Sequence, residues 1–410
     1  MPRNMESCRL APLTHQDGKL AIFIKSLKGG GAERSTVNLA NALAASGVDV
    51  DLLVVDEKGV FHDLVSDKVN FIRLRQASFV QTMRSLWRYP MDLLYLLRLI
   101  VIPSSPKPAA AVPALADYLR KTRPRALLTA LDYGNIAAVV ARTVSDVDTR
   151  IVIGQRNQLS EGYTGRAKWR QKHVAPTLRY FFERADAIVS VSKGVSKDLG
   201  EALKLPDHQL HAVYNAVYNS TLEKQSLEDM QHVWFNNKEI PVIIAVGKLK
   251  PQKDFETLIK AFALVRTKLK ARLIILGEGP MLSDLNLLVE KLNISDHVIF
   301  EGFVQNPFKY MRNADLFVLS SKYEGLPGVL VQALACGCPV VSTDCPSGPR
   351  EILENGKYGP LVPVADANAL ATAIISQLQT RHDRDYLQIR GRSFSEEEAV
   401  RGYLRVLLGN

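Results

Sequence analysis

The sequence contains few cysteines and lacks long apolar runs. Four cysteines occur in 410 residues, and they form neither a regular framework nor a C-x-x-C pair. This count excludes a disulfide-stapled secreted domain and favours a reducing compartment. No stretch reaches the roughly 18 consecutive apolar residues of a membrane-spanning helix, and the amino terminus lacks a charged segment followed by an apolar core. We therefore expect a cytoplasmic protein, with a polar lead-in over residues 1–18.

The length and net charge of the chain limit the number of domains and the class of partner. A chain of 410 residues that is 47% hydrophobic can bury two cores, so two domains are expected. Lysine and arginine outnumber aspartate and glutamate by 52 to 42, a formal net charge of +10. An excess of this sign favours anionic partners such as nucleotide phosphates, nucleic acids or acidic lipid headgroups.

Short apolar runs alternate with helical patterns along the chain, which predicts parallel, doubly wound sheets. A polar stretch over 220–239 interrupts the alternation and is interpreted as the interdomain linker and the entry into the second domain. The expected strands are 20–24, 50–55, 126–130, 151–154, 187–191 and 210–214 before it, and 242–246, 272–276, 297–301, 315–319 and 339–342 after it.

Residues 315–353 carry the most functional information. They predict a strand, a polar loop ending at Gly325, an apolar helix and a second strand. In such βαβ units a ligand binds at the carboxyl ends of the strands, so the loop containing Glu324 is expected to face it. Gln332 lies eight residues after Glu324, a little over two helical turns, so both side chains can contact one elongated ligand.

Two further loops also follow strands directly. Residues 28–31 form a glycine-rich turn that opens a helix, where free backbone N–H groups favour an anion. Residues 246–253 read VGKLKPQK and carry several lysines.

These patterns together resemble the group 1 retaining glycosyltransferases, which use nucleotide sugars. Glu324, Gly325 and Pro327 match the family's E-G-x-P element, and 246–253 resembles its V-G-R-L-x-x-x-K loop, with Lys248 in place of the arginine. The resemblance implies an α/β GT-B fold, in which two Rossmann-like domains face a cleft. It places an acceptor-binding domain at 1–218 and a nucleotide-sugar-binding domain at 219–393, with 394–410 returning to the first domain.

The resemblance also implies the site residues. Glu324, Lys253 and Lys248 are the expected catalytic residues, because lysines stabilise the charge on a leaving diphosphate. In the family, a second glutamate eight residues after the first usually accepts hydrogen bonds from the ribose hydroxyls of the nucleotide. Here that position is Gln332, whose side chain can still accept a hydrogen bond but has no negative charge. The residues implied for nucleotide-sugar binding are Gly30, Gly31, Gly247, Phe303, Val304, Gly325, Leu326, Pro327 and Gln332.

The family often has a histidine near the sugar, after the strand at 126–130, and this sequence has none there. Asp132, Arg156 and Asn157 are the candidates for acceptor or sugar contact instead. The resemblance implies neither a metal site nor a cofactor, since lysines supply the positive charge.

The function implied is transfer of a hexose or N-acetylhexosamine from a UDP-sugar to a lipid-linked or growing polysaccharide acceptor. Two alternatives remain open. A nucleotide-sugar 2-epimerase shares the GT-B architecture but lacks the E-G-x-P helix entry, and a catalytically silent nucleotide-sugar-binding subunit would fit Gln332 and the missing histidine.

Residues 86–102 are apolar and aromatic with interspersed arginines. This composition suits a helix in the interface of an anionic membrane, which implies a peripheral position on the inner face of the plasma membrane. A buried helix within 84–125 is the other interpretation. Nucleic-acid binding would use the same charge, but no recognised module accompanies it, so no nucleic-acid partner is expected.

Overall fold

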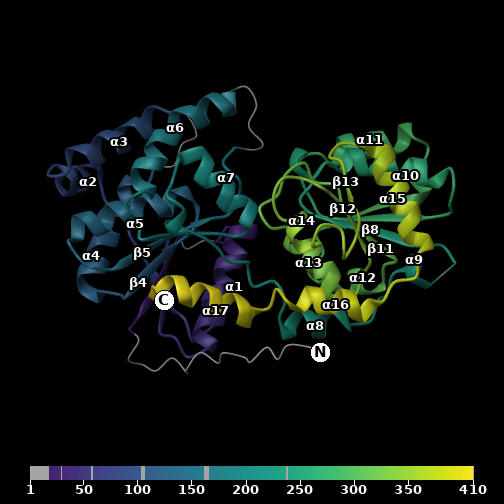
Figure 1. Ribbon diagram of the computed structural model, residues 1–410, viewed down its shortest axis with the longest axis horizontal. Helices are drawn as coiled ribbons and strands as arrows, with labels where there is room; N and C mark the ends of the chain where they lie inside the picture. The colour runs from purple at the N-terminus through teal and green to yellow at the C-terminus, as the bar shows by residue number, and fades with distance from the viewer. Residues whose placement is uncertain are drawn as a thin grey trace.

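The computed structural model describes residues 18–28, 30–56, 59–102, 107–160, 166–236 and 239–409. It contains two parallel β-sheets, each flanked by helices on both faces, and the two resulting units lie side by side (Figure 1). The α/β class and the doubly wound parallel sheets predicted from the sequence are confirmed. The amino-terminal lead-in lies outside the described residues, apart from Gly18.

The first sheet has seven parallel strands in the order β3-β2-β1-β4-β5-β6-β7. The order reverses between β1 and β4, so loops at the carboxyl ends of these strands diverge and leave room for a ligand. The sequence analysis missed β3, an edge strand whose side chains are only partly buried. The strands are β1 (Leu20–Ser26), β2 (Val50–Asp56), β3 (Asn70–Arg73), β4 (Ala126–Thr129), β5 (Arg150–Gln155), β6 (Ala187–Ser190) and β7 (Leu210–Ala212).

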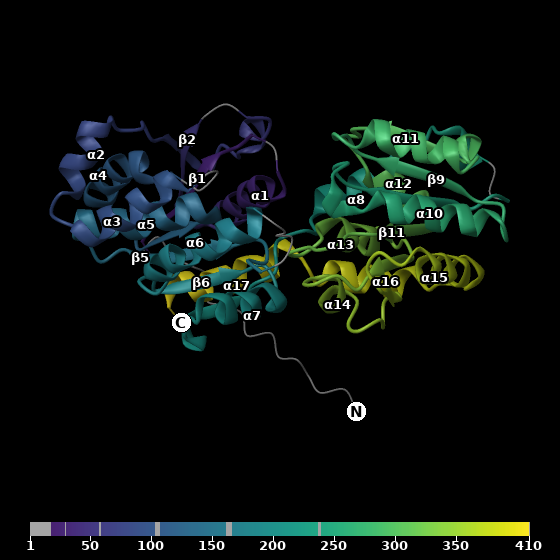
Figure 2. The same cartoon turned by 90° about the horizontal axis from the view of Figure 1, so that it is seen from above.

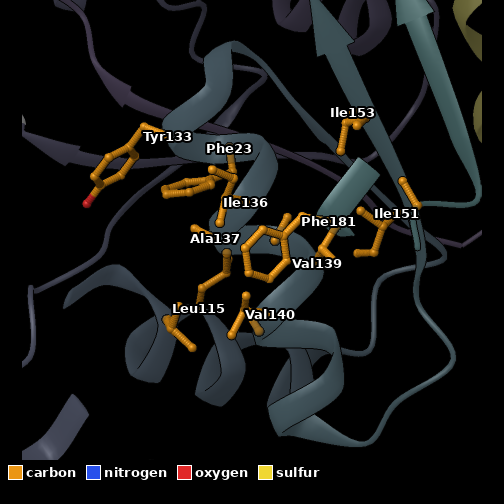
Figure 3. Packing of buried hydrophobic residues seen from close by; sticks show 14 of the residues in the cluster. Phe23, Leu115, Tyr133, Ile136, Ala137, Val139, Val140, Ile151, Ile153 and Phe181 are labelled. Carbon is orange, nitrogen blue, oxygen red and sulfur yellow. The ribbon is translucent and has the colours of Figure 1, made fainter. Parts of the chain in front are cut away.

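Apolar side chains on both faces of this sheet form separate cores. One core joins the sheet to α2 through α7, and part of it is shown in Figure 3, where Phe23, Ile153 and Phe181 pack around α5. The other core joins the opposite face to α1 and α17. The helices are α1 (Gly31–Ala45), α2 (Phe79–Leu86), α3 (Pro90–Val101), α4 (Val112–Thr122), α5 (Leu131–Ser145), α6 (Arg166–Phe182) and α7 (Lys193–Leu203).

Helices α2 and α3 include most of the segment 86–102, for which the sequence allowed two interpretations, a helix in a membrane interface or a helix buried in the core. Leu86, Leu96 and Leu99 are buried, whereas Trp87 and Leu94 are 70% and 59% exposed. One face of these helices is therefore buried in the core, and the opposite face is exposed.

A buried charge fixes which face of α3 points inward. Asp92 is 3% exposed, accepts a hydrogen bond from the Tyr180 hydroxyl at 2.9 Å and forms an ion pair with Arg184. Buried charges are stable when paired and hydrogen-bonded in this way. Asp92 thus anchors α3 on α6.

The second sheet has six parallel strands in the order β10-β9-β8-β11-β12-β13. Its order reverses between β8 and β11, which places the two loops singled out from the sequence next to each other. The strands are β8 (Val242–Val246), β9 (Arg272–Leu276), β10 (Val298–Gly302), β11 (Leu316–Leu319), β12 (Val340–Thr343) and β13 (Leu361–Val362).

The segment 220–239, interpreted as the linker and the entry into the second domain, is helical over much of its length. Asn219 caps α8, and Leu222 is buried in the core that α8 shares with α12 and α13, so α8 belongs to the second unit. Residues 237–238 lie outside the described part. The helices are α8 (Ser220–Ser226), α9 (Val233–Asn236), α10 (Phe255–Arg266), α11 (Leu282–Lys291), α12 (Phe308–Asn313), α13 (Gly328–Ala335), α14 (Pro349–Ile352), α15 (Ala367–Gln379), α16 (Arg384–Arg392) and α17 (Glu396–Leu408).

The chain passes between the two units twice, and the two passages lie side by side. Backbone N–H groups of Val217 and Tyr218 both donate to the Phe394 carbonyl at 3.0 Å, and Glu396 N–H donates to the Tyr218 carbonyl at 3.2 Å. After this crossing α17 runs along the first unit, where Tyr403, Leu404 and neighbouring residues enter its core (Figure 1).

Candidate active site

Glu324 is held at the carboxyl end of β11 by two hydrogen bonds. It is 8% exposed, and its Oε1 accepts from Lys253 Nζ at 2.5 Å and from Ser321 Oγ at 2.6 Å. A charge-assisted bond to an ammonium group is among the stronger hydrogen bonds in proteins. The structure therefore joins the E-G-x-P loop and the basic loop, two elements 71 residues apart, in one cluster.

Backbone contacts tie the same two loops together. Gln252 donates its side-chain amide to the Tyr323 carbonyl at 2.8 Å, and its own carbonyl accepts from Lys322 N–H at 2.8 Å. Ser320 Oγ donates to the Lys253 carbonyl at 2.8 Å. The position of Lys253 is thus set by several bonds, which gives the preorganisation that electrostatic catalysis requires.

Three lysines gather around the single carboxylate. Lys248 is exposed after Gly247, and a Cβ on Gly247 would lie 3.3 Å from Lys253 Cε. Burial lowers the pKa of Lys250, and the nearby ammonium groups of Lys253 and Lys248 lower it further, while the charge of Glu324 raises it. The sequence analysis missed Lys250 because it stands at an unspecified position of the family loop. Together the loops present an excess of positive charge.

Helix α13 continues the site away from Glu324. Pro327 is its N-cap residue, Leu326 packs on the core beside it, and Gln332 lies one turn inside the helix, half-buried. A Cβ on Gly348 would lie 2.4 Å from Pro327 Cδ, so the loop before α14 supports the helix entry closely.

We expect Gln332→Leu to weaken binding of UDP by about 1–3 kcal/mol, because a buried ligand hydroxyl would lose its acceptor. Gln332→Glu should retain or tighten binding, since a carboxylate is the stronger acceptor. Calorimetric titration with UDP measures both. An unchanged affinity in Gln332→Leu would assign this side chain to helix packing alone.

The loop after β10 presents an exposed aromatic ring. Phe303 is 74% exposed and its N–H donates to Glu278 Oε1 at 3.3 Å, whereas Val304 packs on the core. Glu278 belongs to the turn 277–280, which follows β9. A Cβ on Gly277 would lie 2.0 Å from the Gly247 carbonyl oxygen, so this turn packs directly on the basic loop.

The glycine turn of the first unit leads into α1. Gly30 is the N-cap residue and makes no side-chain hydrogen bond, and no atom lies within 4 Å of a Cβ built on Gly31. Gly29 lies outside the described residues. The Glu33 carboxylate lies at this amino terminus, because a Cβ on Gly30 would be 2.4 Å from its Oε2. An anionic ligand at these amides would therefore have to displace Glu33.

Arg156 has structural partners rather than an open position. It is 7% exposed, and its Nη1 donates to Asn215 Oδ1 at 2.6 Å and to the Tyr403 hydroxyl at 3.2 Å. The guanidinium thereby ties α17 to the end of β5. Its carbonyl oxygen matters for the site, because a Cβ on Gly325 would lie 2.1 Å from it. Only glycine at 325 allows this approach of the first unit to the E-G-x-P loop.

The other two candidates lie in the first unit, after β5 and at the start of α5. Asn157 is exposed, and its carbonyl accepts from the Gln155 side chain at 2.7 Å. Asp132 is half-buried in the first turn of α5, next to Leu131, which has a positive φ of 67°. Such a backbone conformation is strained for leucine and is typical of functional loops.

The cysteines beside α13 are ordinary buried thiols. Cys336 and Cys338 are not in disulfides, and burial raises the pKa of the Cys336 thiol to about 12. Within the described residues no group of three or more histidine, cysteine or acidic side chains is arranged to hold a metal ion.

The fold and the lysine-glutamate site define a GT-B glycosyltransferase. Family models agree on both halves of the chain: "Glycosyl transferases group 1" matches residues 228–394, and "Glycosyltransferase Family 4" matches residues 29–219. The chain thus carries a group 1 glycosyltransferase domain and a family 4 glycosyltransferase domain, and its relatives are glycosyltransferases.

Individual relatives extend along nearly the whole chain. An N-acetylgalactosaminyltransferase of Campylobacter jejuni, named for its diphospho-undecaprenol-linked acceptor, is 28% identical over 95% of this chain and 100% of its own length. The lipopolysaccharide core glycosyltransferase LpsE of Rhizobium meliloti is 26% identical over 93% and 96%. The solved structure of Anabaena HepE with UDP-glucose superposes with a TM-score of 0.74 at 18% identity, covering 96% of this chain and 100% of that one.

Proposed function

We propose that the protein is a retaining glycosyltransferase that moves a hexose or N-acetylhexosamine from a UDP-sugar to a lipid-linked or growing polysaccharide acceptor. The observation that carries the proposal is the Glu324–Lys253 pair, set at the carboxyl ends of β11 and β8 with Lys248 and Lys250 beside it. The acceptor class is supported by the names of the Campylobacter and Rhizobium relatives, and the donor by the UDP-glucose bound to HepE.

The lysines supply what breaking of the sugar–phosphate bond requires. As that bond breaks, the leaving diphosphate gains negative charge, which fixed ammonium groups stabilise more than they stabilise the intact donor. Glu324 keeps Lys253 in place through Oε1, and its Oε2 takes no part in either of the two hydrogen bonds described above. Gln332 is assigned to the ribose and the exposed loop at Phe303 to the base.

We expect full activity in excess EDTA, because the three lysines provide the positive charge that a divalent ion supplies in other transferases. Initial rates with and without chelator measure this. A complete loss of activity that Mg²⁺ restores would refute the assignment of the lysines.

Transfer assays test the whole proposal. The purified protein is incubated with labelled UDP-glucose, UDP-galactose, UDP-N-acetylglucosamine, UDP-N-acetylgalactosamine or GDP-mannose, together with a bacterial lipid extract. We expect label in the lipid fraction from one UDP-sugar, and NMR of the product should show the donor's anomeric configuration. Epimerised donor without transfer would favour the isomerase alternative, and UDP binding without any reaction would favour the silent subunit.

A peripheral membrane position would bring the enzyme to a lipid-linked acceptor. Seven apolar side chains of α2, α3 and the turn between them are exposed, as are Arg84 on α2, Arg88 in the turn and Arg98 on α3. Apolar and aromatic groups flanked by arginines suit an anionic bilayer interface, where each basic residue adds about 1 kcal/mol. No described helix is long and apolar enough to cross a bilayer. The seven residues are Phe79, Val80, Trp87, Met91, Leu94, Leu97 and Ile100.

Replacing Trp87, Leu94, Leu97 and Ile100 with serine and Arg88 with glutamate should release the protein from anionic liposomes without lowering its melting temperature. The substituted side chains are all exposed, so the core is untouched. Liposome sedimentation measures binding. As a matched control, Leu96→Ser is expected to lower the melting temperature because Leu96 is 3% exposed. Retained liposome binding in the folded multiple variant would contradict the membrane assignment.

A further inference from the structure

Glu351 belongs to the second unit but bonds to the first. It lies on α14, and its Oε2 accepts from the backbone N–H of Lys193 at 2.9 Å, while Oε1 accepts from that of Gly194 at 2.8 Å. The Tyr214 hydroxyl donates to Oε2 at 3.1 Å. In both views α14 lies on the side of the second unit that faces α7 (Figures 1 and 2).

The carboxylate completes the amino terminus of α7. Ser192 is the N-cap residue, and its hydroxyl accepts from Val195 N–H at 3.2 Å. Lys193 and Gly194 are the next two donors, which have no partner within their own helix. Glu351 satisfies both, and the helix dipole favours its negative charge. Burial raises the pKa of Tyr214 to about 12, with a further contribution from the charge of Glu351.

The same contact leads directly to the E-G-x-P loop. Glu324 N–H donates to the Pro346 carbonyl at 3.3 Å, and a Cβ on Gly348 would lie 2.4 Å from Pro327 Cδ. A Cβ on Gly194 of α7 would lie 2.6 Å from Ser347 Oγ. The loop is thus held between two contacts with the first unit, the Glu351 bonds through residues 346–348 and the Arg156 carbonyl against Gly325.

We propose that Glu351 is a positioning residue that holds the second unit, and with it the loop that carries Glu324, against α7 of the first unit. Its carboxylate can bond to the α7 amides only when the units are close together. Loss of these bonds removes the charged contact between the units and leaves the chain crossings near Tyr218 and Phe394 and the packing at Gly325, so the units can move apart. This inference concerns the arrangement of the units and does not depend on the identity of the donor.

Variants on both sides of the contact test it. Glu351→Ala removes the acceptor, and α14 stays anchored because Arg390 donates to the Glu351 and Ile352 carbonyls at 2.7 and 2.8 Å. Lys193→Pro removes one donor, and proline is well accepted at this first helical position because Ser192 before it is extended, with φ −156° and ψ 160°. The matched controls are Lys193→Ala, which keeps the N–H, and Glu354→Gln, which removes a nearby exposed carboxylate.

Small-angle X-ray scattering and amide hydrogen exchange give readouts independent of catalysis. For Glu351→Ala and Lys193→Pro we expect a larger radius of gyration than for the wild type. For Glu351→Ala we also expect exchange at Gly194 N–H at least about tenfold faster, as for loss of one charged hydrogen bond. Both controls should match the wild type, and melting curves establish that each variant is folded.

Turnover and UDP affinity, measured together, distinguish a positioning role of Glu351 from a role in local structure alone. Turnover should fall in Glu351→Ala and Lys193→Pro, while their affinity for UDP, titrated by calorimetry, stays near that of the wild type because the lysine loop is untouched. An unchanged radius of gyration and unchanged Gly194 exchange in folded Glu351→Ala would overturn the proposal. Absence of sugar transfer in the wild type would instead count against the proposed function and leave the scattering and exchange results valid.

Discussion

Replacing Lys253 with alanine is expected to lower the turnover number at least about a hundredfold, the scale seen when one preorganised charge-stabilising donor is lost. Lys253 is the lysine that contacts Glu324 directly, and its backbone is held by Ser320. The remaining Lys248 and Lys250 keep the site positive, so UDP should still bind. Steady-state kinetics with the donor identified by the transfer assay measures the effect.

Lys260→Ala is the matched control for this prediction. Lys260 lies on α10, pairs with Glu256 at 2.6 Å on an exposed face, and should be dispensable for turnover. Near-wild-type turnover in Lys253→Ala would remove Lys253 from the diphosphate assignment, and one of the other two lysines would have to take its place.

Replacing Glu324 with alanine should abolish transfer while leaving much of the affinity for UDP. The carboxylate stands at the helix entry, on the sugar side of the proposed donor, whereas UDP is assigned to the lysines and Gln332. Because this change also leaves Lys253 without its partner, Glu324→Gln is the variant that keeps the side-chain shape and removes only the charge. Product formation and UDP titration are measured on both.

A double-mutant cycle that combines Glu324→Ala with Lys253→Ala shows whether the two side chains contribute to turnover jointly or independently. Residues that act together are strongly non-additive, so the double variant should be little worse than the more damaging single one. Fully additive losses would mean that Glu324 and Lys253 act on separate parts of the donor. Retained transfer in Glu324→Gln would show that its negative charge is not required.

The sequence predicted most of the second unit because its chemistry is local. In β8 and β11 a buried strand ends in a polar loop, so the strand and the adjacent basic or acidic loop could be predicted together from a short window. The 2.5 Å contact between Lys253 and Glu324 then follows from the order of the sheet, in which β8 and β11 are neighbours. The family pattern named both residues but not their mutual contact.

The sequence was less informative where the burial or bonding of a residue depends on segments that are distant in the chain. Asp92 lies within the apolar segment 86–102, and its burial depends on Tyr180 and Arg184, about ninety residues away in the sequence. Likewise Glu351 bonds to amides 157 and 158 residues earlier, and backbone donors have no side-chain pattern to identify them. Edge strand β3 was missed because its partly buried residues lack the apolar run of a central strand.

The packing of α17 has a consequence for the order of folding. Val400, Tyr403, Leu404, Val406 and Leu407 are buried against the first sheet, yet they are synthesised after every strand of the second. During translation the part of this face that α17 covers, beside α1, therefore stays exposed until the second unit has emerged. A fragment ending near residue 218 would keep that part of the sheet exposed to water and to other chains, which is a route to aggregation.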